Sequence, residues 1–187
     1  MKVEETSLPG VLLITPAVFG DARGYFKELR NVRRFRESGL DMDFVQDNLS
    51  FSRQGILRGL HFQNPGAQGK LVQALQGEVF DVAVDIRHGS PNFGRWFGAV
   101  LSGENHRQMY VPEGFAHGFY VLSETAMFAY NCTNYYAPEA EFSLRFDDPD
   151  IGIEWPFHVP PILSAKDQAA LNLRDFPVDS LPPYSAD

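Results

Sequence analysis

The apolar residues of this chain come in short runs, and Gly, Pro, Asn or Ser repeatedly interrupts them. The runs have the length of strands rather than helices, and many short strands separated by turn residues are typical of a β-sandwich or barrel. We therefore predict an all-β fold with strands at residues 11–14, 44–45, 56–60, 71–75, 79–86, 96–101, 108–111, 119–122, 126–132 and 142–146.

Two short helices are expected beside these strands. One covers residues 32–38, with Asn31 as its N-cap and Gly39 as its stop, and the other covers 165–171 behind the capping pattern Ser164-x-x-Asp167. No repeat or linker divides the chain, so we expect a single domain over residues 1–187, with the Pro-rich tail 176–187 lying on the surface or fraying.

Composition excludes several classes of protein. The net charge of -8 argues against binding of nucleic acid or an anionic membrane by bulk charge, so an anionic ligand would need a local cluster of cations. The single cysteine, Cys132, excludes an internal disulfide. The N-terminus does not resemble a signal peptide, and no apolar run approaches the ~20 residues of a membrane span. We expect a cytoplasmic protein.

The run 79–86 contains an unusual face. Its even-numbered positions are all apolar, whereas its odd-numbered positions include Asp81 and Asp85 on either side of Ala83. Carboxylates do not face a dry core without partners. This face is therefore either the solvent side of a sandwich or part of a site whose partners come from elsewhere.

Two of the five histidines lie in distinctive surroundings. His61 shares a strand-like run with Arg58 and Gly59, and His117 ends a Pro-x-Gly-x-x-His pattern like that of cupin barrels. Cupin metal sites usually take a His-x-His pair and a nearby Glu, but the chain has Gln63 in place of the second histidine. Two histidines do not assemble a three-nitrogen site, so we expect no metal and no cofactor.

Proton transfer is the chemistry that the remaining residues favour. His61 could act as a general base with Asp81 as its orienting carboxylate. Lys70 is either a surface lysine or a group that stabilises an oxyanion. Tyr130 is either a core aromatic residue or a proton donor.

A series of motifs in order along the chain resembles one family, the dTDP-4-dehydrorhamnose 3,5-epimerases, which are metal-free cupin-like enzymes. The motifs include FGDARGYFKE (19–28), FVQDNLS (44–50), GILRGLHFQ (55–63), GKLV (69–72), GEVFDVAVD (77–85), PEGFAHGF (112–119), YYAPE (135–139), DDPDIGI (147–153) and LSAKD (163–167). The resemblance runs from about residue 3 to 175. It implies a jelly-roll sandwich and an isomerase that inverts both carbons beside the keto group of dTDP-4-dehydro-6-deoxyglucose.

The resemblance also implies residue roles. His61 would be the base, ordered by Asp81, while Lys70 would hold the enolate oxygen and Tyr130 would return a proton from the opposite face. The substrate-binding positions would be Phe19, Arg23, Glu28, Gln46, Asn48, Arg58, Lys70, His117, Tyr136, Glu141, Lys166 and Asp167, with Tyr136 stacking on the thymine. In the family, part of the N-terminal segment reaches into the partner's site, which implies a homodimer.

Three alternatives remain at the level of sequence: an epimerase that acts on one carbon of a related deoxysugar, a metal-dependent cupin enzyme, and a carbohydrate-binding jelly roll without catalysis. Strand alternation adds one structural expectation. Arg58 and His61 differ by three positions, so both can face one pocket only if Gly59 marks a bulge or a strong twist.

Overall fold

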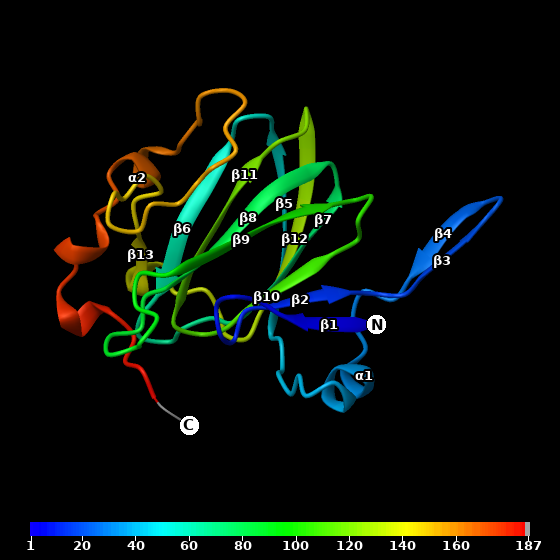
Figure 1. Cartoon of the computed structure of the whole chain (residues 1–187), viewed down its shortest axis with the longest axis horizontal. Helices are drawn as coiled ribbons and strands as arrows, with labels where there is room; N and C mark the ends of the chain where they lie inside the picture. The colour runs from blue at the N-terminus through cyan, green and yellow to red at the C-terminus, as the bar shows by residue number, and fades with distance from the viewer. Residues whose placement is uncertain (186–187) are drawn as a thin grey trace.

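The computed structural model describes residues 1–185 and consists mainly of antiparallel sheets (Figure 1). A six-stranded sheet has the order β1-β2-β10-β7-β12-β5, and a five-stranded sheet has the order β13-β6-β11-β8-β9. The strands are β1 Lys2–Glu5, β2 Leu12–Thr15, β3 Val18–Asp21, β4 Gly24–Lys27, β5 Gln46–Arg53, β6 Leu57–Gln63, β7 Lys70–Gln76, β8 Glu78–Asp85, β9 Trp96–Ser102, β10 Gln108–Val111, β11 Phe115–Val121, β12 Thr125–Cys132 and β13 Glu141–Ser143. The expected all-β fold is confirmed.

The main core lies between the two large sheets. Val72 and Phe128 from the six-stranded sheet pack in one buried cluster with Val79, Ala83 and Phe119 from the five-stranded sheet. Alternation places these side chains on the inner faces, and burial of such apolar area is the chief force that holds two sheets together. The two sheets therefore form opposing walls on which polar residues can be held at fixed positions.

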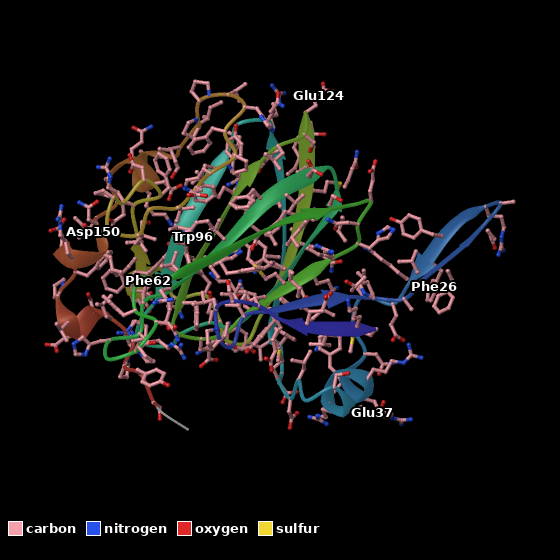
Figure 2. The ribbon with its side chains drawn as sticks, viewed as in Figure 1. Phe26, Glu37, Phe62, Trp96, Glu124 and Asp150 are labelled. Atoms are coloured by element: carbon pink, nitrogen blue, oxygen red, sulfur yellow. The ribbon has the colours of Figure 1, made fainter. Side chains whose placement is uncertain are left out.

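The outer face of the five-stranded sheet is buried as well. Val82 and Val84 of β8 pack against Leu173, Phe176 and Leu181 of the C-terminal segment. Phe62 and Trp96 of this second cluster lie on the same side of the molecule as that segment (Figure 2). Strand β8 is thus covered on both faces, and the interpretation of its carboxylate face as a solvent side is wrong: Asp81 and Asp85 are both 0% exposed.

The C-terminal tail does not fray over its described length. Leu181 is buried, and the backbone N–H of Tyr184 donates to the carbonyl oxygen of His88 at 3.0 Å. The Arg87 guanidinium lies over the rings of Phe115 and Tyr184. Apolar side chains between the prolines anchor the tail, which the Pro-rich composition did not indicate. The last two residues of the tail prediction, 186–187, lie outside the described residues.

Both predicted helices exist. Helix α1 (Val32–Glu37) begins after Asn31, whose side chain accepts a hydrogen bond from the Arg34 N–H. Helix α2 (Ala165–Gln168) begins after Ser164 and ends three residues earlier than expected. The reason is tertiary, because Leu171 leaves the helical path and forms a bridge with Leu144. A short 3-10 helix at Pro138–Ala140 lies between β12 and β13, and two more follow α2, at Leu173–Asp175 and Val178–Ser180.

The hairpin formed by β3 and β4 projects from the sandwich (Figure 1), and Phe26 lies on this projection (Figure 2). Phe19, Tyr25 and Phe26 are more than half exposed on it. The pattern of apolar runs did not predict these strands. Among residues 1–185, no helix has both the length and the apolar character needed to cross a membrane.

Strand β6 carries the expected irregularity at Gly59. On β11, His117 pairs with His61 of β6 and Phe119 pairs with Arg58. The two β11 residues are two positions apart, whereas the two β6 residues are three positions apart, so β6 holds one extra residue. Gly59 has a φ of 115°, and a Cβ atom there would lie 2.6 Å from the Gly118 Cα. The extra residue turns Arg58 and His61 toward the same cavity.

We expect the substitution Gly59→Ala to destabilise the protein by about 1–3 kcal/mol or more, because it adds backbone strain and a steric overlap with β11. Gly89→Ala is the matched control, since Gly89 also has a positive φ (88°), but a Cβ atom added there would meet no other atom within 4 Å. Urea unfolding measures both free energies. Equal losses of stability in the two variants would contradict the close approach of β6 to β11.

Candidate functional site

A cavity of about 590 Å³ opens between the two sheets, within the size range of small-molecule sites. Both sheets and the segment 162–167 contribute to its lining. Eleven of the side chains predicted from the sequence are brought together there: Gln46, Asn48, Arg58, His61, Lys70, His117, Tyr130, Tyr136, Glu141, Lys166 and Asp167. The cavity therefore collects most of the predicted site.

His61 lies in the wall formed by the five-stranded sheet. Its Nε2 is 2.6 Å from Asp167 Oδ1, and its Nδ1 is 3.9 Å from Glu141 Oε1. Burial alone would raise the pKa of Asp167, but the hydrogen bonds from His61 and Ser164 outweigh burial and hold this pKa below its usual value. An ionised carboxylate only accepts, so Nε2 donates to it and Nδ1 keeps the lone pair. This arrangement suits a general base that acts through Nδ1.

The expectation that Asp81 orients His61 is wrong. Asp81 instead pairs with His117, whose Nε2 is 3.0 Å from both carboxylate oxygens. The cause is strand order: β11 lies between β6 and β8, which puts these two strands about 10 Å apart, and Ala83 rather than Asp81 is level with His61. Burial raises the pKa of Asp81, and the contact with His117 opposes that effect. Asp167, expected only as an additional polar residue, is the carboxylate that holds His61.

The opposite wall presents Lys70 from β7 and Tyr130 from β12, two neighbouring strands of the six-stranded sheet. Both side chains are half-buried. Burial lowers the pKa of Lys70, while burial raises the pKa of Tyr130 and so keeps its phenol protonated in the neutral range. Cys132 pairs with Lys70 across the strands and also lines the cavity, where burial raises the pKa of its thiol. A phenol and an amine thus face the His61 wall.

A polar group lies beside His61. The Tyr136 hydroxyl donates to Glu141 Oε2 at 2.8 Å, and Lys166 Nζ is 2.7 Å from the same oxygen. Burial would raise the pKa of Glu141, but the hydrogen bonds from Lys166 and Tyr136 hold it below its usual value. The Tyr136 ring is half exposed, so a planar base can stack on it.

Three predicted binding residues lie apart from the cavity in the single chain. Phe19 and Arg23 belong to the projecting hairpin, and the Arg23 side chain is 89% exposed and pairs with Asp21. Glu28 binds Arg34 at 3.0 Å. Within one chain these residues contribute nothing to the cavity walls.

Two residues that sequence reasoning did not assign to the site support it. Ser164 lines the cavity and bonds Asp167; its capping pattern was visible in the sequence, but the second bond was not. Gln63 lies where a cupin would place its second metal-binding histidine, yet its amide holds the backbone of Tyr135 and Ala137. Nothing local in the sequence signals that role. Within residues 1–185, no three His, Cys, Asp or Glu side chains are grouped to hold a metal ion.

Known proteins are similar to this chain over nearly its whole length. The family model described as dTDP-4-dehydrorhamnose 3,5-epimerase matches residues 5–175. The dTDP-4-dehydrorhamnose 3,5-epimerase of Salmonella typhimurium is 58% identical, with 91% of this chain and 94% of that protein covered. The corresponding protein of Pseudomonas aeruginosa is 55% identical, with 94% and 97% covered.

One solved structure is similar across the entire fold. The dTDP-6-deoxy-D-glucose-3,5-epimerase of Legionella pneumophila, crystallised with dTDP-4-keto-L-rhamnose, superposes with a TM-score of 0.97 at 52% identity, with 99% of each chain covered. The cupin-like fold expected from the sequence is therefore confirmed.

Proposed function

Because the chain belongs to the dTDP-4-dehydrorhamnose 3,5-epimerase family, we propose that it converts dTDP-4-dehydro-6-deoxy-D-glucose into dTDP-4-dehydro-L-rhamnose. The observation that carries the proposal is the placement of His61 and Tyr130 on facing sheets. A sugar ring between them would have a base on one face and a proton donor on the other, which inversion requires.

The chemistry follows from the acidity of a proton next to a ketone. His61 Nδ1 takes that proton, and the Asp167 carboxylate stabilises the imidazolium that forms. The electron pair moves onto the keto oxygen, where the Lys70 ammonium stabilises the enolate. Tyr130 then gives its proton to the same carbon from the opposite face. His61 returns its proton to solvent and Tyr130 regains one, and the sequence repeats at the second carbon.

The nucleotide would lie toward the exposed part of the cavity. The Tyr136 ring offers a stacking surface for the thymine. The Gln46 side chain accepts a hydrogen bond from the Tyr136 backbone N–H and so fixes the loop that carries Tyr136. Arg58 reaches the cavity with its Nε bound to Ser52, which supports a role in binding the diphosphate. Asn48, His117, Glu141 and Lys166 are the remaining proposed contacts.

We also propose a homodimer in which Phe19, Arg23 and Glu28 reach the cavity of the partner. The exposed aromatic residues of the projecting hairpin support this, because an unpartnered apolar surface favours association. Sedimentation measures the oligomeric state at the enzyme concentration of the assay. A monomer there would contradict the dimer proposal. The cytoplasmic location expected from the sequence stays a prediction.

Solvent deuterium uptake tests the reaction. In D2O the wild-type protein should place deuterium at both carbons beside the keto group, as followed by NMR of the sugar nucleotide. A reaction without protein corrects for spontaneous exchange. No exchange would overturn the epimerase proposal, and exchange at one carbon only would reduce it to a single-site epimerase.

A further inference from the structure

We propose that Ser164 is a positioning residue for the general base, and that its hydroxyl locks the Asp167 carboxylate in the orientation that holds His61. The proposal rests on the proposed function of His61. It assigns to Ser164 an action through Asp167 rather than through contact with the sugar.

The geometry around Asp167 carries the inference. Ser164 Oγ donates to Asp167 Oδ2 at 2.8 Å, and the same Oγ accepts from the Asp167 backbone N–H at 3.2 Å. The other carboxylate oxygen, Oδ1, is 2.6 Å from His61 Nε2. Each oxygen therefore has its own partner, and the carboxylate cannot rotate without breaking one bond. Asp167 is 4% exposed, so water has little access to replace a lost partner.

The neighbouring charged groups do not supply a substitute. Lys166, next in the chain, directs its ammonium to Glu141 at 2.7 Å. Glu141 itself approaches the other side of the His61 ring, at Nδ1. Among the described residues, the side-chain hydrogen bonds to Asp167 come from His61 and Ser164. In the His61–Asp167 pair, Ser164 is thus the side chain that fixes Oδ2, the carboxylate oxygen that His61 does not contact.

The same hydroxyl caps helix α2, which has only four residues and gains little stability from its own length. Helix capping and carboxylate orientation can be separated by substitution. Glycine is nearly as good an N-cap as serine but has no donor, whereas threonine keeps both functions. Ser164→Gly should therefore lose mainly the bond to Oδ2, and Ser164→Thr should keep it.

We expect kcat/KM to fall by about 10- to 100-fold in both Ser164→Gly and Ser164→Ala, the usual scale for loss of a group that orients a functional histidine. Ser164→Thr should restore activity to near the wild-type value. Ser180→Ala is the matched control, because it removes a serine bond to the Pro177 carbonyl oxygen in a surface turn.

The pH profile of kcat/KM separates positioning from a merely structural role. The acidic limb of the profile reports loss of activity as the His61–Asp167 pair takes up a proton. Without the hydrogen bond from Ser164, the Asp167 carboxylate attracts protons more strongly, both on itself and on the His61 ring. The acidic limb should therefore move to higher pH. The other charged or titratable groups that line the cavity are unchanged in these variants. They are Arg58 from β6, Lys70 from β7, His117 from β11, Tyr130 and Cys132 from β12, Tyr136, Glu141 from β13 and Lys166 from α2.

The outcomes are distinguishable. A Ser164→Gly variant with wild-type kcat/KM and an unmoved acidic limb would overturn the role of Ser164 while the deuterium test of the wild type still stands. A fall in activity and in Tm together, with no shift of the limb, would assign the serine to helix capping alone and would also overturn it. Absence of exchange in the wild type would instead remove the proposed function itself.

Discussion

Replacing His61 with Asn should lower kcat by about 100- to 10,000-fold, because general-base catalysis is typically worth that much. The shorter amide is polar and fits within the space of the imidazole, so the cavity should keep its walls, although the amide does not reach the position from which Nε2 donates to Asp167. It cannot accept the proton from the sugar. Turnover of the dTDP-keto-sugar and calorimetric binding of dTDP measure the two effects separately, and binding should change little.

His158→Asn is the matched control, since His158 is exposed and does not line the cavity. A carbohydrate-binding protein without catalysis would give a different result, because His61→Asn would then leave both binding and biological function intact. Turnover of the His61→Asn variant at the wild-type rate would exclude His61 as the base.

The local features of this fold could be predicted from the sequence. Most strand positions follow from short apolar runs, although β1 was missed and the strand expected at 44–45 is wrong, because β5 begins at Gln46. Helix α1 follows from Asn31 and from Gly39, whose φ of 79° suits a helix stop. The irregularity at Gly59 followed from the spacing of Arg58 and His61 together with the family resemblance, which requires both side chains to reach one pocket. Each of these inferences depends on residues close together in the chain.

The pairing of the acidic residues could not be predicted in the same way. His61 and Asp167 are separated by 106 positions, and only the docking of α2 against β6 brings them together. Asp81 shares the correct strand face but belongs to β8, one strand too far away. Alternation predicts which face a side chain occupies but not the order of the strands. That order decides which histidine each carboxylate meets.

The hairpin β3–β4 was missed for a related reason. Its aromatic residues do not form an apolar run bounded by turns, and they are exposed in the single chain instead of packing into its core. Aromatic residues that lie outside the core carry no signature of a core strand. The resemblance to the epimerase family assigned Phe19 and Arg23 to a binding site, which the periodicity of the segment did not indicate.

Replacing Tyr130 with Phe should separate proton exchange from inversion. His61 and Lys70 remain, so the base can still remove the proton and the enolate can still form. With no donor on the facing sheet, His61 returns a proton to the face from which it took one. The expected result in D2O is deuterium in recovered substrate of unchanged configuration, with epimerised product reduced by about 100-fold or more.

The substitution keeps the ring that packs beside Phe128, so loss of folding should not obscure the result. Tyr184→Phe is the control, because it removes the hydroxyl of a residue that does not line the cavity and keeps the ring over which Arg87 lies. Inversion at the wild-type rate in Tyr130→Phe would exclude the phenol as the donor. A parallel loss of exchange and inversion would place Tyr130 in proton removal and contradict its assignment to the opposite face.

Burial raises the pKa of Tyr130, so wild-type inversion should persist through neutral pH and be lost only as the pH rises through that pKa.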